Sequence, residues 1–172
     1  MLAIARRCCT NSLVINPDKT KLLVIGVPQI TRSLPFCPVV KLLGKEIKPV
    51  PVAKDLGVII DSSLSYNEHV TKTVSNCTHR LIRINKIRHL LDRKTLLSLI
   101  NAFVFSKLFY CSTVWRNTSK TNIKKMQLVQ NFAGRIVLGL RKYNYIPEGL
   151  KSLRWLPIAD KLLLNDCMCY GP

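Results

Sequence analysis

The spacing of apolar residues divides the chain into two parts of different character. Up to residue 61 the apolar runs are short and contain many β-branched residues, as in strands, and proline-rich connections separate them. Beyond residue 61 apolar residues recur every three or four positions, as on one side of a helix. Short antiparallel strands in one small sheet are predicted at residues 22–27, 39–43, 46–50 and 56–60.

The first long helix is predicted over residues 66–91. Ser65 and Glu68 have the spacing of a capping box, in which each side chain accepts a hydrogen bond from an N–H group of the first turn. Arg88 falls on the apolar side, so its stem is expected to be buried with the charge directed outward. The apolar side consists of Val70, Val74, Cys77, Leu81 and Ile84, and the opposite side of Lys72, Asn76, His79, Arg83 and Lys86.

Asp92 is a suitable N-cap for a second helix, which is predicted to run to about Val114. From residue 96 to 115 the only charge is Lys107, so this helix is apolar nearly all round. Twenty such residues have the length of a bilayer span. A central lysine is costly in lipid, however, and the pattern favours a core helix packed on several sides.

The third long helix is predicted over residues 121–140. One side is apolar, from Ile123 to Leu140, and the other is polar and basic. Pro147 and Pro157 then mark the starts of two short helices, because proline suits the first turn of a helix. The polar side carries Lys124, Gln127, Asn131 and Arg135.

These elements predict an α+β protein, with a small antiparallel sheet followed by a mainly helical region. A chain of 172 residues with 48% hydrophobic content is large enough for a core. Twenty-seven lysines and arginines face nine acids, giving a net charge of +18. Such an excess indicates a polyanionic partner, although a solvated basic surface without a fixed partner has the same composition.

Neither the cysteines nor the start of the chain indicates secretion. The seven cysteines form no Cys-x-x-Cys pair, and the three histidines lack zinc-finger spacing, so no metal site is predicted. The first seven residues do not have the charge order of a secretory signal, and they only weakly resemble a mitochondrial presequence. Thiols in a reducing compartment, in the nucleus or the cytoplasm, are therefore expected.

The sequence lacks the carboxylate pair that holds two metal ions in polymerases and nucleases. Its nine acids are scattered, with no two adjacent, and the closest candidates, Asp55 and Asp61, flank a single predicted strand. There is also no phosphate-binding Gly-x-x-x-x-Gly-Lys loop and no Gly-x-Ser-x-Gly elbow. No complete active site is therefore predicted in this chain.

Four stretches, in this order, resemble the reverse transcriptases of non-LTR (LINE-type, jockey-like) retrotransposons. Residues 11–26 resemble the segment that follows the catalytic motif, and residues 55–69 the next motif, with its Leu-Gly-Val, Asp, Leu and His. Residues 127–135 resemble the Gln-Asn-x-x-x-Arg helix. Residues 150–157, Leu-Lys-Ser-Leu-Arg-Trp-Leu-Pro, resemble a Leu-x-x-Leu-x-Trp-Leu-Pro signature. Together they extend over nearly the whole chain.

The resemblance implies that residues 1–61 are the end of the polymerase palm, residues 62–145 a thumb-like domain and residues 146–172 the start of a truncated C-terminal extension. It implies that Lys19 assists the departure of pyrophosphate and that Leu56, Gly57 and Val58 lie at the hairpin that grips the primer. The fingers and the aspartates that bind magnesium are expected upstream of Met1. This chain alone is therefore expected to be inactive, with Mg²⁺ required only by the intact enzyme.

The function expected from both arguments is binding of an RNA or DNA template–primer, tolerant of sequence and sensitive to salt. Two alternatives stay open. One is a basic helical module that binds acidic proteins or membrane surfaces, and the other is an intact enzyme whose product begins upstream. The phosphate contacts are expected from Lys72, Arg83, Lys86, Lys124 and Arg135.

Overall fold

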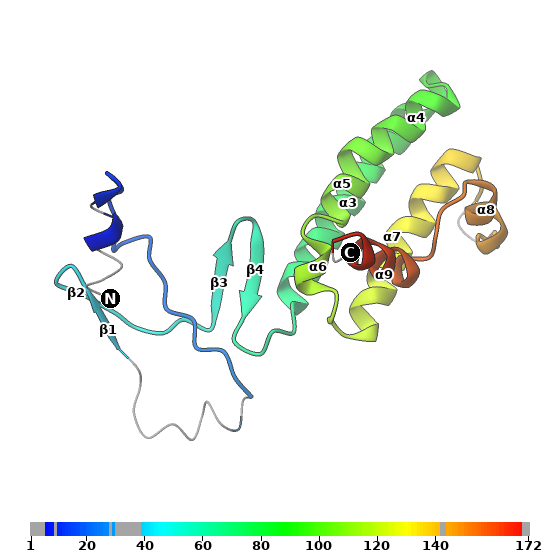
Figure 1. Ribbon diagram of the computed structural model, residues 1–172. Coiled ribbons are helices and arrows are strands. Elements are labelled where there is room, and N and C mark those ends of the chain that lie inside the picture. Colours follow the sequence, from blue (N-terminus) through cyan, green and yellow to red (C-terminus); the bar gives the residue numbers. More distant parts are fainter. Residues whose placement is uncertain (1–5, 9, 28, 30–38, 142–143, 170–172) are drawn as a thin grey trace. The chain divides into compact units, whose positions relative to one another are not determined.

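The protein is α+β, as predicted: two small antiparallel sheets precede a mainly helical region (Figure 1). The computed structural model describes residues 6–8, 10–27, 29, 39–141 and 144–169. The chain divides into two compact units, Met1–Leu64 and Ser65–Pro172. The named strands belong to the first unit and the long helices to the second.

The strands form two separate hairpins, so the prediction of one sheet is wrong. β1 (Val40–Leu42) pairs with β2 (Lys45–Ile47), and β3 (Val52–Asp55) pairs with β4 (Val58–Asp61). In each turn both central residues have positive φ. In the β3–β4 turn these residues are Leu56, with φ 43°, and Gly57, with φ 89°. That geometry matches the twist of the strands and is typical of tight two-residue hairpins. Leu56 and Gly57 are thus turn residues, and the strand predicted from residue 56 begins at Val58.

The strand predicted over residues 22–27 does not form. Leu22 makes a single parallel bridge with Pro49, in which the Val50 N–H donates to the Leu22 carbonyl at 2.8 Å. Proline has no N–H to donate, so the ladder is interrupted at this point. Farther along, the Gly26 N–H donates to the Ser62 carbonyl at 3.1 Å. This segment is therefore held by isolated hydrogen bonds.

α3 (Asn67–Ile87) is the first predicted long helix, followed by the short 3₁₀ helix η1 (Arg88–Leu90). The predicted capping box at its start is wrong. The N-cap is Tyr66, in the left-handed conformation, and the Ser65 hydroxyl accepts a long hydrogen bond from the Asn67 N–H at 3.4 Å. The apolar face is confirmed at Val70, Cys77, Leu81 and Ile84, which are buried.

The second predicted helix is shorter than expected and contains a π-helical turn. It consists of α4 (Arg93–Ile100), the π turn η2 (Asn101–Phe105) and α5 (Ser106–Leu108). Asp92 is the N-cap, as predicted, and accepts from the Lys94 and Thr95 N–H groups. The helix buries one stripe at every fourth residue, Leu96, Ile100, Val104 and Leu108, while Phe103 is 53% exposed. The helix is therefore not buried all round, because the π turn keeps this four-residue stripe on one side. It nevertheless contacts both α3 and α7 and packs Phe105 against Trp155, in agreement with the predicted core helix.

The remaining helices follow the predicted order with shifted ends. α6 (Ser112–Trp115) is a single turn after the break at Cys111, which has φ 50°. α7 (Lys120–Leu138) is capped by Ser119 and ends at Gly139, whose φ of 69° suits glycine. α8 (Pro147–Ser152) starts at its proline, as predicted, and α9 (Ile158–Cys169) follows Pro157. In the described parts of the chain, no helix is long and apolar enough to cross a bilayer.

The core of the second unit lies between α3, the α4–α5 segment and α7. Trp115, Leu81, Ile100, Leu108 and Met126 are each less than 5% exposed. The Trp115 indole N–H donates to the Tyr110 carbonyl at 2.9 Å, so the ring is buried with its polar group satisfied. This core fixes the spacing of α3 and α7, the two helices that carry the predicted phosphate-binding cations.

His69 provides a test of this core through pH. Its ring is buried and lies 5.9 Å from the Trp115 ring. Burial, and then the charge of Lys107, lower the pKa of His69 below its ordinary value of 6.5. Since the unfolded chain takes up this proton first, the free energy of unfolding should fall as the pH drops below about 6.5. Urea unfolding at about pH 7.5 and pH 5 measures this loss, and His69→Gln should reduce it. An equal loss in both proteins would contradict this assignment.

Candidate nucleic-acid interface

The structure places the five predicted phosphate-binding cations on two adjacent helices. Lys72, Arg83 and Lys86 are exposed on α3, Lys124 is exposed on α7, and Arg135 is half-buried on α7. Among the described residues, no carboxylate lies within ion-pair distance of any of these five. In the described part of the second unit the ion pair is that of Arg116 with Asp166, at 2.7 Å. The five cations therefore remain available to an external anion.

α3 and α7 run parallel, which sorts the cations into two groups. Asn122 at the start of α7 donates to Asn67 at the start of α3 at 2.7 Å, and one turn later the Lys125 amine lies 3.5 Å from the Thr71 hydroxyl. Positions on α7 therefore lie beside α3 positions about 55 residues earlier. Lys124 is then within about one turn of the level of Lys72, and Arg135 within about one turn of the level of Arg83. The two levels are about 16 Å apart along the helix axes.

The polar face of α7 is narrower than predicted, because part of it binds the start of α9. The Gln130 amide donates to the Leu156 carbonyl at 2.8 Å, and the Gln127 amide oxygen accepts from the Ile158 N–H at 2.9 Å. Gln127 also donates to Gln130 and Asn131. The prediction that Gln127 faces outward with the cations is therefore wrong. Its amide serves tertiary structure, where a buried polar group needs a partner.

A second arginine joins Arg135 at the C-terminal ends of α3 and α7. Arg88 and Arg135 line a hollow of about 190 Å³, together with Asn85 and Phe132. The Nε of Arg135 is buried and has no hydrogen-bond partner among the described residues. Arg88 is half-buried, as expected, and its guanidinium lies beside Gly139. Two arginines that line one hollow are suited to bind a phosphate group.

Arg88 was not among the residues predicted to contact phosphate. Its only sequence signal was its position on the apolar side of α3, which by itself indicates a buried stem. The contact with the end of α7 depends on helices whose starts are 53 residues apart, from Asn67 to Lys120. Helical periodicity within α3 therefore could not indicate it.

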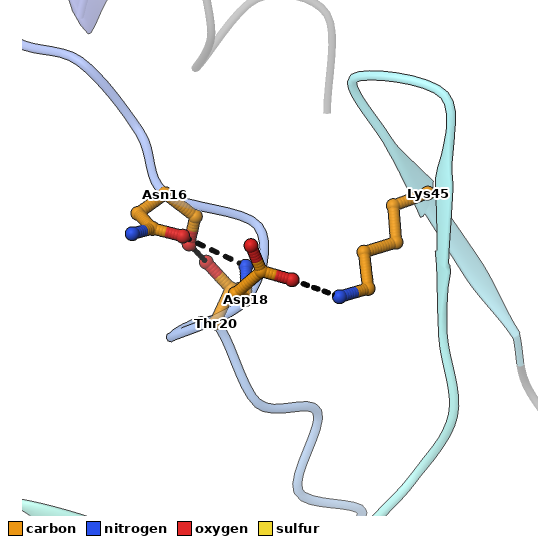
Figure 2. Close-up of polar contacts among 4 residues, drawn as sticks. All are labelled: Asn16, Asp18, Thr20 and Lys45. Carbon is orange, nitrogen blue, oxygen red and sulfur yellow. Dashed lines mark hydrogen bonds and ion pairs between the residues drawn. The ribbon is translucent and has the colours of Figure 1, made fainter.

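In the first unit, Lys19 lies in a well-bonded turn. The Asn16 side chain accepts from the Asp18 N–H at 2.9 Å and the Asn16 carbonyl accepts from the Thr20 hydroxyl at 2.9 Å, which confirms the predicted turn (Figure 2). Asp18 forms an ion pair with Lys45 of β2. Lys19 itself is exposed, so it is accessible to a phosphate, but its role in pyrophosphate departure stays a prediction.

Leu56, Gly57 and Val58 lie at the tip of the β3–β4 hairpin. Leu56 is 82% exposed while Val58 is buried. Leucine rarely adopts positive φ, so its conformation here costs backbone energy that the hairpin must offset. An exposed apolar side chain next to a glycine presents a surface on which a strand could lie. The primer-grip role of these three residues stays a prediction.

The described carboxylates do not fit a magnesium site. No group of three His, Cys, Asp or Glu residues converges to hold a metal ion within the described ranges. Asp92 caps α4. The hydrogen bonds that its carboxyl group accepts, the largest effect coming from the Thr95 side chain, lower the pKa of this group. No step of nucleotide transfer is therefore assigned to these residues. Three of the other acids form the pairs Asp18–Lys45, Glu46–Lys41 and Asp166–Arg116.

The four stretches that carry the family resemblance form two contacting pairs. Residues 11–26 meet residues 55–69 through the hydrogen bond from Gly26 to Ser62. Residues 127–135 meet residues 150–157 through the hydrogen bond from Gln130 to Leu156. In the second pair Leu150 packs so closely against Gly134 that a Cβ at that glycine would lie 2.9 Å from Leu150 Cδ2. Each pair is thus one structural feature made from two distant motifs.

Comparison with known proteins gives two relatives. The chain is 25% identical over 135 residues to the RNA-directed DNA polymerase from mobile element jockey of Drosophila funebris. It is 24% identical over 143 residues to a probable RNA-directed DNA polymerase from transposon BS of Drosophila melanogaster. These alignments cover 77% and 80% of the chain. The resemblance to non-LTR retrotransposon reverse transcriptases is confirmed.

The chain spans only part of these reverse transcriptases, 15% of the length of each relative. No protein-family model matches it, and no solved structure does either. The reverse-transcriptase-like sequence is thus supported by the relatives, while the division into palm and thumb stays a prediction.

Proposed function

We propose that this reverse-transcriptase-like chain binds a template–primer duplex through its second unit. The observation that carries the proposal is the set of cations on α3 and α7 with no carboxylate partner among the described residues. A duplex presents two rows of phosphates, and two parallel helices with cations at two levels are suited to contact them. Contacts of this kind fix the position of a nucleic acid without reading its bases.

In this proposal the most specific phosphate contact is the one made by Arg88 and Arg135, which line one hollow. A planar guanidinium bonds two oxygens of one phosphate, and two arginines in one hollow can enclose the group from both sides. The other four cations are exposed, and in this proposal they contact phosphates along the backbone of the duplex. They are Lys72, Arg83, Lys86 and Lys124.

The roles implied by the family resemblance complete the proposal. The RNA-directed DNA polymerase named for each relative acts on nucleic acid, and this chain aligns with part of it. We assign residues 1–61 to the palm, 62–145 to the thumb and 146–172 to the extension. The β3–β4 hairpin, with Leu56 at its tip, would contact the primer end, and Lys19 would reach a phosphate. This is a proposal for an intracellular protein that binds nucleic acid.

Salt dependence tests this function directly. With about five phosphate contacts, the logarithm of the association constant should fall against the logarithm of the salt concentration with a slope of roughly −4 to −5. Affinity for an RNA–DNA duplex should then fall a few hundred-fold between about 50 and 200 mM salt. Fluorescence anisotropy with labelled duplexes of two unrelated sequences measures both the slope and the tolerance of sequence.

The same titration separates the alternatives. Equal affinities for the two sequences support backbone contacts, and a large difference would contradict them. Absence of binding at about 50 mM salt would refute the proposal. Flotation with vesicles that contain anionic lipid is the matched control. Capture by vesicles at salt concentrations that abolish duplex binding would favour the membrane-surface module instead.

A further inference from the structure

A second hollow of the helical unit combines aromatic and cationic side chains. It lies where the π turn of the second helix meets the connection between α8 and α9, and its volume is about 260 Å³. This is slightly below the usual range for drug-sized ligand pockets, about 300–1,000 Å³, and it suits a ligand the size of one nucleotide. Its walls include Asn101, Phe105, Phe109, Arg154, Trp155 and Lys161.

The aromatic side chains form a corner. The rings of Phe105 and Trp155 are edge to face, with centroids 4.7 Å apart and planes at 76°. The Phe109 ring lies 5.9 Å from that of Phe105. All three side chains are half-buried, so they are held in place and still leave ring surface open. A planar heterocycle can stack on one such face while the perpendicular ring contacts its edge.

Both walls of the hollow contain backbone in an uncommon conformation. On one side the Ser106 N–H bonds to the Asn101 carbonyl five residues back, and π turns of this kind are frequent at functional sites. On the other side Arg154 has φ 55°, a strained conformation for arginine, and the Trp155 N–H donates to the Leu150 carbonyl. Arg154 and Trp155, adjacent in the sequence, thus line the hollow with a guanidinium and an aromatic ring.

The charges of the hollow favour an anion. Arg154 and Lys161 contribute two cations, and none of the described residues that line it is acidic. Asn101 is exposed and adds an amide with both a donor and an acceptor. An aromatic corner, an amide and two cations together match a ligand with a flat heterocycle at one end and a phosphate at the other. A nucleotide is the ligand of this chemical class.

We propose that this hollow binds one unpaired nucleotide, with the base against Phe105 and Trp155 and the phosphate at Arg154 and Lys161. The inference rests on the proposed function, since the nucleotide would belong to a single-stranded overhang of the duplex held by α3 and α7. A free nucleoside monophosphate has the same chemistry, and the experiment distinguishes the two sources.

The experiment compares a blunt RNA–DNA duplex with the same duplex carrying a single-stranded overhang, by fluorescence anisotropy on the full chain. Stacking of one base should make the overhang duplex bind roughly 5- to 100-fold more tightly. Phe105→Leu, which keeps an apolar side chain, and Arg154→Gly should both abolish that advantage while leaving blunt-duplex affinity within about threefold. Lys151→Gln removes one exposed cation of α8 that does not line the hollow, and should keep the advantage.

Arg154→Gly is informative because glycine adopts positive φ without strain, so the fold should be kept or stabilised. Titration with adenosine monophosphate, followed by tryptophan fluorescence, is the second arm. Quenching that Trp155→Phe removes supports a free nucleotide as ligand. An overhang advantage without quenching supports the strand-bound nucleotide.

The inference is overturned if the overhang gives no advantage and adenosine monophosphate gives no quenching, or if both hollow variants keep the advantage. These results differ from failure of the proposed function, in which the blunt duplex itself does not bind at low salt. In that case quenching by adenosine monophosphate still reports on the hollow independently.

Discussion

Reversing the charges of Lys72 and Lys124 together should lower the affinity for an RNA–DNA duplex by about 100-fold near 0.1 M salt. Each phosphate contact that is lost removes about 0.9 from the salt slope, which corresponds to roughly tenfold in affinity at this salt concentration. Both side chains are exposed and lie at about the same level of α3 and α7, so the double variant Lys72→Glu/Lys124→Glu should fold normally. Anisotropy titrations at several salt concentrations measure the affinity and the slope, which should be about 2 smaller in magnitude.

The matched control is Lys94→Glu/Lys151→Glu, which changes the net charge by the same amount at exposed positions of α4 and α8. It should lower the affinity much less, because only long-range attraction is altered. If both double variants weaken binding equally, net charge rather than the α3–α7 face determines affinity. That result would contradict the proposed interface.

Replacing Trp115 with alanine should lower the free energy of unfolding of the helical unit by about 3–5 kcal/mol. The side chain is 1% exposed, near α3 and α7, and its loss leaves a large cavity and removes the hydrogen bond from the indole N–H to the Tyr110 carbonyl. This loss is a large part of the total free energy of unfolding of a typical domain. The variant is therefore expected to be partly unfolded at physiological temperature. Urea unfolding followed by far-UV circular dichroism measures the loss.

Val114→Ala is the control for this substitution, since the neighbouring side chain is 50% exposed. Its effect should be below about 0.5 kcal/mol. A loss below about 1 kcal/mol for Trp115→Ala would show that the described packing around the indole is wrong. The duplex affinity of the folded fraction should also fall in this variant, because the core sets the spacing between α3 and α7.

The relation between the two halves of the family signature follows from packing. Residues 127–135 and 150–157 are separated in the sequence, yet Gln130 bonds to Leu156 and Leu150 fills the space above Gly134. The same contacts bring Trp155 to Phe105, and so build one wall of the aromatic hollow. Residues 150–157, which look like an isolated signature in the sequence, therefore connect the end of α8 with α7 and with the π turn η2.

The sequence by itself determined the α+β class, the presence and order of the long helices, the Asp92 cap and the buried face of α3. These features depend on neighbours within a few residues, so local periodicity and capping chemistry are sufficient to indicate them. It also determined the large positive charge and the resemblance to retrotransposon reverse transcriptases, which the relatives confirm.

The tertiary structure alone decided which side chains meet. Strand pairing in separate hairpins placed Leu56 and Gly57 in a turn, and the docking of α9 turned Gln127 inward, away from solvent. Contacts between helices distant in sequence joined Arg88 to Arg135, and Phe105 to Trp155. A helical period specifies the direction of each side chain on its own helix. It does not specify which helix lies opposite, because that depends on packing throughout the unit.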